Sequence, residues 1–475
     1  MGITDTDTKG GYTGRARRSL REFFDFEEYD ADVKTEVVAG ITTFLTMSYI
    51  VVVNPAILGQ AISIPGYSQA AVVSMLTVVT IVAAAVATLI MALYANRPFA
   101  QAPGLGLNAF FAFTVVLTLG VSWQTALAAV VVEGVLFAAL TAVGARKFII
   151  QAFPEPVKFA VGSGIGAFLA LIGLQAMGVV VADPEGTYIT LGNVASNPVA
   201  VLSIVGLFLT LALYARGVRG SILVGILATA GAGYAAEVAG LVAPGVLTTQ
   251  FTAPVYDITP LAGAFLSGFG NVEPFGFALI VFTFFFVDFF DTAGTLTGVG
   301  QAAGFLDEDG DLPEIEKPLM ADAVGTTVGG ILGTSTVTTY IESATGVEEG
   351  GRTGLTALVV AILFLLSLAF VPIAAAIPAY ASHIALVVIA VVMLQNITAV
   401  DWDDITHTVP AGLTILIMPF TFNIGYGIAA GIISYPVVKV AVGEWREVSV
   451  PQWFLAGAFV VYFVVQTGGV MQAAV

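Results

Sequence analysis

The chain has 475 residues, of which 57% are hydrophobic and only 10% are charged. An average soluble domain has about 25% charged residues, so this composition indicates a polytopic membrane protein and excludes an ordinary soluble domain. The net charge of −17 disfavours nucleic-acid binding and favours a salt-loving host, in which acidic loops stay hydrated. There is no Cys, and the 2 His lie in different segments, which excludes thiolate chemistry and disfavours a metal centre or other cofactor.

Residues 1–35 are predicted to form a cytoplasmic leader in which arginines stand beside phenylalanines. These residues are Arg15, Arg17, Arg18, Arg21, Phe23, Phe24 and Phe26. An amphipathic surface helix and a solvated arm both fit this composition. The polarity of the segment argues against a cleavable signal peptide.

Apolar windows then follow along the whole chain and predict about 14 transmembrane segments. The first half contains 36–58, 69–95, 103–118, 122–144, 157–179, 198–215 and 220–240, and the second contains 273–300, 318–333, 336–347, 352–376, 379–397, 408–421 and 424–441. A last window, 452–468, is either an extra crossing or a sign that some windows between 408 and 441 are half-helices.

The basic residues give this layout an orientation. All 16 of them fall on one side of the predicted membrane, whereas the loops near 60–68, 118–122, 180–197 and 241–270 contain none. Positively charged loops stay in the cytoplasm, so we expect a multi-pass protein of the cell membrane with a cytoplasmic N-terminus.

The two halves have corresponding interrupted segments, which predict an inverted repeat. The third window of the first half lies in RPFAQAPGLGLNAFFAF, and the third window of the second half lies in GTSTVTTYIESATG. With seven spans in each half, the two repeats must have opposite orientations in the membrane. Paired interrupted segments at matching positions are the best sequence pointer to a transporter site.

Two carboxylates lie in the first apolar window of the second half, within FFFVDFFD. Acidic side chains at membrane depth are costly, so Asp288 is a candidate for substrate binding or proton coupling and Asp291 is a candidate for proton coupling. A helix–helix hydrogen bond from Asp288 to a Thr or a backbone group is the structural alternative.

Glu342 lies between Gly333 and Gly346 in the interrupted segment of the second half. The β-branched residues at 336–339 favour a short strand, which makes Thr339 part of the candidate site. A half-helix after this strand would direct N–H groups at a ligand, and Glu342 would accept ring N–H groups or exchange a proton. Capping of the helix by Glu342 is the alternative.

The matching segment of the first half contributes Asn108 and Phe110. Asn108 offers both donors and an acceptor to a heterocycle edge, and Phe110 is suited to stacking, although packing is the commoner role of such rings. Thr43, in the first window, is a weaker substrate-binding candidate. No Walker A lysine motif is present, so ATP use is not expected, and the chain has no nucleophile constellation typical of a membrane enzyme.

Four motifs together resemble one family. YDADVKTEVVAGITTFLTMSYIVVVNP, QAPGLGLNAFFAF, FFFVDFFDTAGTLTGV and TSTVTTYIESATGVEEGGRTGL occur in this order. The chain resembles the adenine/guanine/hypoxanthine permeases, a branch of the nucleobase–cation symporters related to the uracil and xanthine permeases. The resemblance runs from about residue 30 over nearly the whole chain.

The resemblance implies an all-α membrane fold of fourteen segments in a 7+7 inverted repeat, with short strands in segments 3 and 10. It divides the chain into a core domain, residues 36–144 and 273–376, and a gate domain, residues 157–240 and 379–475. By motif position it places substrate contacts on Asp288, Glu342 and Asn108. It leaves a homodimer open.

The function implied is import of purine bases by cation symport. The proton is the usual coupling ion, and sodium remains the alternative because the acidic composition departs from typical relatives. Two other functions stay open at this point: a uracil/xanthine-type permease, and an anion transporter or channel on the same fold.

Overall fold

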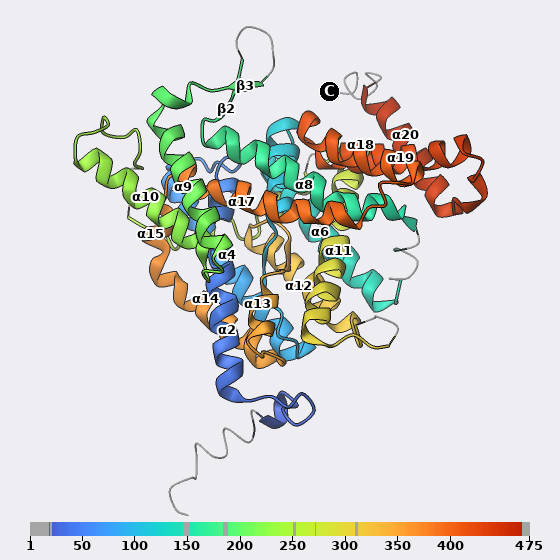
Figure 1. Ribbon diagram of the computed structural model, residues 1–475, viewed down its shortest axis with the longest axis horizontal. Helices are drawn as coiled ribbons and strands as arrows, with labels where there is room; N and C mark the ends of the chain where they lie inside the picture. The colour runs from blue at the N-terminus through green and yellow to red at the C-terminus, as the bar shows by residue number, and fades with distance from the viewer. Residues whose placement is uncertain are drawn as a thin grey trace, which may run out of the picture.

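The computed structural model describes residues 19, 21–145, 150, 152–183, 189–249, 253–270, 272–308 and 312–467 (Figure 1). Helices dominate both halves. The α-helices are α2 Val33–Met47, α3 Ile50–Leu58, α4 Gln69–Ile90, α5 Leu105–Ala109, α6 Trp123–Ala142, α8 Glu155–Ala176, α9 Pro198–Ala215, α10 Ser221–Val238, α11 Pro274–Ala303, α12 Glu316–Leu332, α13 Ser343–Glu348, α14 Gly354–Leu366, α15 Val371–Ala375, α16 Ala379–Ser382, α17 Ile384–Met393, α18 Ile405–Thr421, α19 Ile424–Ala441 and α20 Val450–Thr467.

Shorter elements interrupt or extend these helices. Two π-helical segments are η1 Met91–Ala95 and η2 Phe110–Thr118, and the 3-10 segments are η3 Val194–Ser196, η4 Ala264–Phe269, η5 Ser367–Phe370, η6 Leu394–Ala399 and η7 Trp445–Glu447. The strands are β1 Gln101–Pro103, β2 Val180–Ala182, β3 Ile189–Leu191 and β4 Val337–Thr339. Each predicted window overlaps an observed helix or strand, and the strand expected at 336–339 is confirmed, whereas the count of fourteen crossings stays a prediction.

Ten helices of the described chain are long and apolar enough to cross a membrane, which makes this a multi-pass membrane protein. Their environments differ. The window of α4 has a mean hydropathy of 2.6 and is 72% buried, whereas that of α9 has a mean hydropathy of 2.2 and is only 22% buried. A helix that is apolar but poorly covered by protein faces lipid, so α4 lies in the interior and α9 at the periphery.

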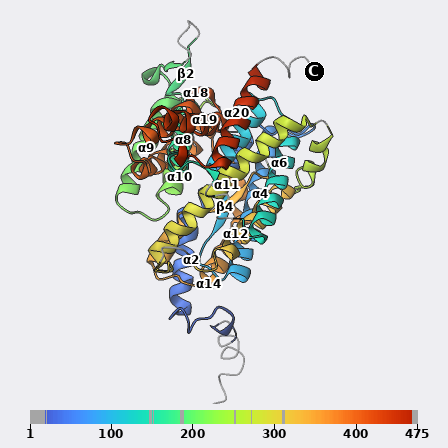
Figure 2. The ribbon, with the colours of Figure 1, turned by 90° about the vertical axis from the view of Figure 1, so that its right-hand side faces the viewer.

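The helices pack in two groups (Figure 2). One group contains α2, α4, α6, α11, α12 and α14, with α12 packed between α4 and α6. The other contains α8, α9, α10, α17, α18 and α19, with α8 packed against α17 and α18. Each group combines helices from both halves of the sequence, so neither half folds as a separate domain.

The described part of the leader folds back on the helices. Phe24 and Phe26 are each 1% exposed and pack with Leu355 of α14. The side chain of Arg21 lies over the Phe26 ring, 5.9 Å from its centroid. A solvated arm does not describe this segment, because Phe24 and Phe26 are buried, whereas residues 21–23 are helical and exposed. The earlier arginines of the leader, like residues 468–475 of the predicted gate domain, lie outside the described residues.

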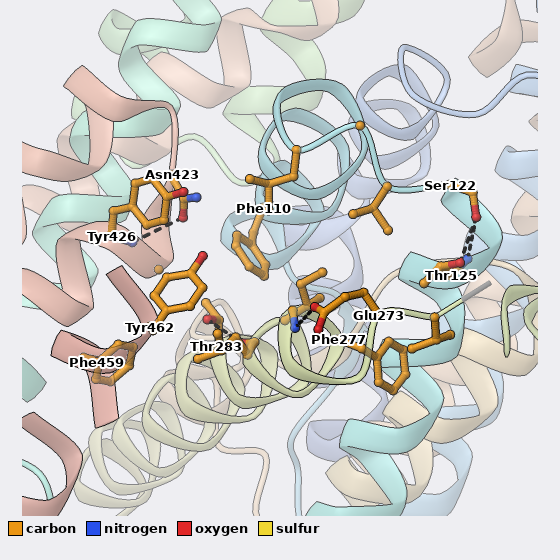
Figure 3. A pocket seen from close by; sticks show the side chains of 18 of the residues that line it. Phe110, Ser122, Thr125, Glu273, Phe277, Thr283, Asn423, Tyr426, Phe459 and Tyr462 are labelled. Carbon is orange, nitrogen blue, oxygen red and sulfur yellow. Dashed lines mark hydrogen bonds between the residues drawn. The ribbon is translucent and has the colours of Figure 1, made fainter. Parts of the chain in front are cut away.

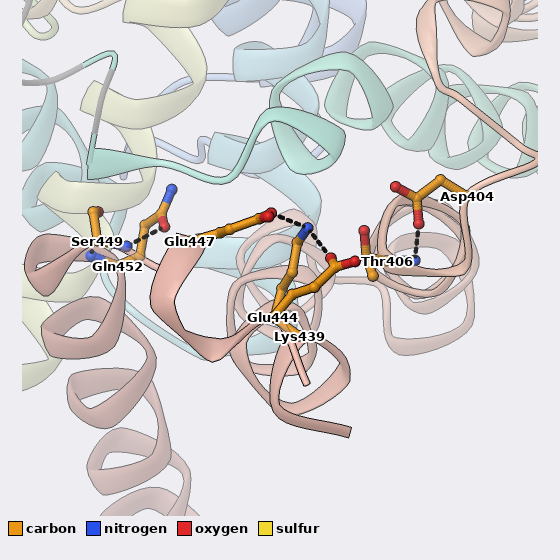
Figure 4. A network of polar contacts seen from close by, with 7 residues as sticks. All are labelled: Asp404, Thr406, Lys439, Glu444, Glu447, Ser449 and Gln452. Carbon is orange, nitrogen blue, oxygen red and sulfur yellow. Dashed lines mark hydrogen bonds and ion pairs between the residues drawn. The ribbon is translucent and has the colours of Figure 1, made fainter. Parts of the chain in front are cut away.

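Short polar residues set the starts of many of these helices. Asp404 caps α18 by accepting the backbone N–H of Thr406 at 2.7 Å (Figure 4). This hydrogen bond lowers the pKa of Asp404 below its ordinary value. A carboxyl with a depressed pKa in the folded state stabilises the protein at neutral pH, and that contribution is lost as the pH falls through the folded-state pKa.

Asp404→Ala is therefore expected to lower the free energy of unfolding by about 1 kcal/mol, the usual cost of losing an N-cap. Asp404→Asn keeps a capping oxygen and should cost much less. Thermal unfolding of the purified protein in detergent at neutral pH measures both. Equal losses in the two variants would show that the charge, not the cap, is what matters.

A buried lysine stabilises the end of α19, the helix that follows α18. Lys439, near the end of α19, is 5% exposed and donates to Glu444 and Glu447, each at 2.7 Å (Figure 4). The pair of carboxylates compensates the lysine charge and closes the turn that leads to α20.

Candidate functional site

Two short strands from opposite halves of the sequence meet inside the bundle. β1 and β4 pair antiparallel, with Gln101 opposite Thr339 and Pro103 opposite Val337. All six strand residues are buried. Irregular backbone is tolerated at membrane depth only where it is covered by protein or lines a cavity, so this pair is the natural place for a small-molecule site.

Each strand leads into a short helix, as the glycines of both segments predict. Gly104 separates β1 from α5, and a Cβ there would lie 2.7 Å from Cγ2 of Thr338. On the other strand, Glu342 occupies the N-cap position of α13, but its side chain makes no capping hydrogen bond. The capping alternative is therefore wrong for the Glu342 side chain.

The carboxylate of Glu342 instead accepts the hydroxyl of Tyr49 at 2.6 Å. Tyr49 lies at the break between α2 and α3, which turns its ring towards the strands. Glu342 is half-buried, and it faces the carboxyl of Asp291 from α11. One acid from each of two elements and a tyrosine hydroxyl thus converge beside the strand pair.

Asp288 has different neighbours from Asp291. Its side chain is fully buried and faces Glu133 of α6 and Asp322 of α12. One of its carboxyl oxygens accepts the hydroxyl of Thr326 at 3.3 Å, and the other has no hydrogen-bond partner. The two acids of the FFFVDFFD motif therefore point to different groups: Asp291 to Glu342, and Asp288 away from it.

Asp322 of α12 holds the strand pair against the surrounding helices through hydrogen bonds. It accepts both the backbone N–H and the hydroxyl of Thr339 at 2.8 Å, the amide of Gln101 at 3.0 Å and the hydroxyl of Thr292 at 3.0 Å. Thr339 is 2% exposed, so its contribution in this structure is to hold β4 in place.

The first-half candidates lie beside the same strands. Asn108 is fully buried and donates from its amide nitrogen to the carbonyl of Pro103 at 3.3 Å, while its amide oxygen is unpartnered. Phe110 packs edge-to-face on Phe284, with ring centroids 4.8 Å apart. Asn108 therefore keeps an acceptor free for a ligand, whereas the Phe110 ring already has an aromatic partner.

Thr43 belongs to the contact between α2 and α13. Its hydroxyl is buried without a partner, and a Cβ on Gly346 would lie 2.1 Å from it. The hydroxyl of Thr46, one turn later, lies 3.1 Å from that of Thr345. These contacts place α2 directly against the half-helix that begins at Glu342.

A cavity of about 490 Å³ lies between the two helix groups (Figure 3). Phe110 and Thr283 line one side of it, and Asn423, Tyr426 and Tyr462 line the other. It has an aromatic lining suited to flat ring systems.

None of the described residues that line this cavity is Asp288, Asp291 or Glu342. We place the candidate site at the strand pair because carboxylates gather there, of which Asp288 and Asp322 are fully buried, and such groups carry a large cost in lipid that only a function or a partner offsets. The cavity is a separate space between the groups, connected to the first-half segment through Phe110.

Known proteins are similar to this chain in sequence. Residues 34–430 match the model of the Permease family, that of xanthine/uracil permeases. The chain belongs to this permease family. The permease is 45% identical over 449 residues to a putative permease of Methanocaldococcus jannaschii, with 94% of this chain and 99% of that protein covered. It is 39% identical to the adenine permease AdeQ of Escherichia coli (94% and 97% covered) and 41% identical to the guanine/hypoxanthine permease PbuO of Bacillus subtilis (90% and 96% covered).

Solved structures share the fold of this permease at low sequence identity. The transmembrane domain of the cyanobacterial bicarbonate transporter BicA aligns with a TM-score of 0.57 and 16% identity, over 84% of this chain and 97% of that one. SLC26A9 aligns with a TM-score of 0.59 and 10% identity, over 93% and 73%. These likenesses establish the fold.

Sequence reasoning missed three residues of this region. Glu133 and Asp322 are carboxylates within apolar or small-residue windows, so the argument that singled out Asp288 could have found both. Tyr49 had no such signal, because a tyrosine in an apolar window is ordinary and only the break between α2 and α3 turns it inward.

Proposed function

We propose that this permease imports purine nucleobases, adenine, guanine or hypoxanthine, by symport with a proton. The observation that carries the proposal is the group formed by Glu342, Tyr49 and Asp291 beside the β1–β4 pair. Relatives that are adenine and guanine/hypoxanthine permeases, covered over most of their length, support the same substrate class.

The chemistry of this group suits a purine. A carboxylate accepts ring and exocyclic N–H groups, and the hydroxyl of Tyr49 holds the Glu342 carboxylate in one orientation. The free amide oxygen of Asn108 adds a second acceptor on the opposite strand segment. Asp291 faces Glu342, and facing acids in this helix group are where a coupling proton would relieve repulsion between negative charges.

The proposed transport cycle uses the two helix groups. The group with α2, α4, α6, α11, α12 and α14 is the core that carries the base, and the group with α8, α9, α10, α17, α18 and α19 is the gate. Fourteen crossings in a 7+7 inverted repeat and a cytoplasmic N-terminus complete the proposal. The basic residues on one side of the layout support that orientation.

Uptake of radiolabelled hypoxanthine into proteoliposomes tests the substrate. Saturable uptake that adenine and guanine compete for is expected, with uracil and xanthine much weaker competitors. Preferential competition by uracil or xanthine would instead identify a permease of the other branch. Uptake driven by sodium at constant pH would replace the proton as the coupling ion.

The fold likeness to a bicarbonate transporter raises anion transport as a second candidate. Carboxylates beside the binding segments disfavour an anion, because like charges repel strongly where water is scarce. Bicarbonate or chloride flux through the same proteoliposomes, at rates far above those of hypoxanthine, would favour this second function.

Tyr49→Phe is expected to weaken purine binding by roughly tenfold, because a hydrogen bond to a charged group contributes about 1.5–3 kcal/mol. The ring is retained, so the fold should be preserved. The KM for hypoxanthine uptake measures the effect. Tyr256→Phe, which removes an exposed hydroxyl bonded to the carbonyl of Leu368, is the matched control and should leave KM unchanged. An unaltered KM in Tyr49→Phe would contradict the role of this hydroxyl.

A further inference from the structure

A second acidic group lies behind the strand pair, away from Glu342. Glu133, in the middle of α6, faces Asp288 of α11 and Asp322 of α12. Glu133 and Asp288 are both 0% exposed. Together with Asp322, they belong to three helices of one group, α6, α11 and α12.

Three carboxyl oxygens of this group lack partners. Both carboxyl oxygens of Glu133 and one of Asp288 are buried without a hydrogen bond. A buried polar atom left without a partner costs about 1–3 kcal/mol, and more when it is charged. In contrast, Glu36, the fully buried glutamate of α2, accepts the backbone N–H groups of Thr353 and Thr356 and the hydroxyl of Thr356. Glu36 shows that a buried glutamate of this protein can be fully hydrogen-bonded. The missing partners of Glu133 therefore indicate a ligand.

The surroundings of Glu133 define the ligand's charge and size. The groups facing it are acids from α11 and α12, and no group of three or more potential metal ligands is found among the described residues. α6 and α12 are in close contact, since a Cβ on Gly134 would lie 2.5 Å from the hydroxyl oxygen of Thr327. Two adjacent carboxylates in a water-poor site repel each other strongly when both are charged, whereas one shared proton removes this repulsion and gives each a partner.

We propose that Glu133 and Asp288 share one transported proton, and that Glu133 is a residue of the ion site. This inference rests on the proposed symport and adds to it an ion site distinct from the Glu342 group. The step is reversible protonation: the pair takes up one proton from the outer side, its net charge changes from −2 to −1, and the proton leaves to the cytoplasm.

Asp322 links this proton to the base. It faces both members of the pair and holds Thr339 and Gln101, one residue on each strand. A proton on the pair removes a negative charge near Asp322, so Asp322 can remain a charged acceptor and keep the strands together. Loading the proton thus favours the assembled substrate site, and by linkage the bound base favours the proton.

Glu133→Gln in proteoliposomes tests the proposal. With about one pH unit imposed, acid outside, one proton per base supports ~tenfold accumulation of hypoxanthine in the wild type. In Glu133→Gln the accumulation ratio should fall to about 1, because a pH gradient can no longer drive uptake. Exchange of internal for external hypoxanthine should continue near the wild-type rate. Glu133→Asp, which keeps the carboxyl, should restore accumulation.

Glu36→Gln is the matched control, since it neutralises a buried glutamate of the same helix group outside the ion site; its folded fraction should still accumulate hypoxanthine. Accumulation by Glu133→Gln at the wild-type ratio, or accumulation that follows sodium and ignores pH, would overturn the proposal.

A measurement that needs no substrate distinguishes the shared proton of Glu133 and Asp288 from the proposed purine transport. Infrared difference spectra between alkaline and acidic pH should show the C=O band of a protonated carboxyl that is lost in both Glu133→Gln and Asp288→Asn. If the band behaves so but no purine is carried, the pair stands and the purine assignment fails. If purines are carried but the band persists in Glu133→Gln, the pair fails and the purine assignment stands.

Discussion

Glu342→Gln should reduce hypoxanthine uptake by roughly 10–100-fold, because it removes the charge from the acceptor that the proposed site offers to purine N–H groups. The amide has nearly the shape of the carboxylate and can still receive the hydroxyl of Tyr49, which donates to Glu342 at 2.6 Å. The loss should therefore arise from weaker base recognition and not from unfolding. Initial rates over a range of hypoxanthine concentrations, with direct binding to the purified protein, measure it.

Glu348→Gln is the control for this variant. Glu348 lies on the same short helix, α13, but is exposed. Its neutralisation should leave uptake at the wild-type level. Undiminished transport by Glu342→Gln would remove Glu342 from the site, and an equal loss in both variants would point to a general effect of charge on α13.

Asp322→Ala should have the largest effect on stability, with the free energy of unfolding lowered by at least roughly 3 kcal/mol. The substitution leaves several buried donors without an acceptor: the N–H and hydroxyl of Thr339, the amide of Gln101 and the hydroxyl of Thr292. The strand pair should lose its register, so uptake should be lost together with stability. Thermal unfolding in detergent and the yield of monodisperse protein measure the change.

Asp403→Ala is the comparison for this effect. Asp403 is an exposed acid in the loop before α18, so its loss should change stability by no more than about 0.5 kcal/mol. A similarly small change in Asp322→Ala would show that water replaces the lost acceptor and that the region is wetter than its burial indicates.

The helices and the strand pair could be predicted because their signals are local. Apolar windows of spanning length give the helices, and glycines with β-branched residues between them give the strand at 336–339. The cost of acids in lipid drew attention to Asp288 and Glu342, whose roles stay predictions. It could not say which acid faces which, because Asp288 and Asp291 differ by three positions on one helix and only the packing of α6 and α12 decides their partners.

Other features depend on contacts between distant parts of the chain. Tyr49 reaches Glu342 across 293 positions of sequence, and Phe110 meets Phe284 across the two halves. Such pairs leave no periodic pattern in the sequence from which they could be predicted. The composition of the leader left a surface helix and a solvated arm open, and it could not show that Phe24 and Phe26 pack against α14.

The pairing of β1 with β4 has a consequence for how the protein is made. A ribosome releases residues 101–103 into the membrane long before residues 337–339 have been synthesised. Until then, the amides of the earlier strand and the side chain of Gln101 lack the partners that the finished protein provides. While the first half is being inserted, the segment around β1 must therefore stay hydrated or be covered by other proteins. A chain that stops before α12 should be degraded by quality control and should not accumulate.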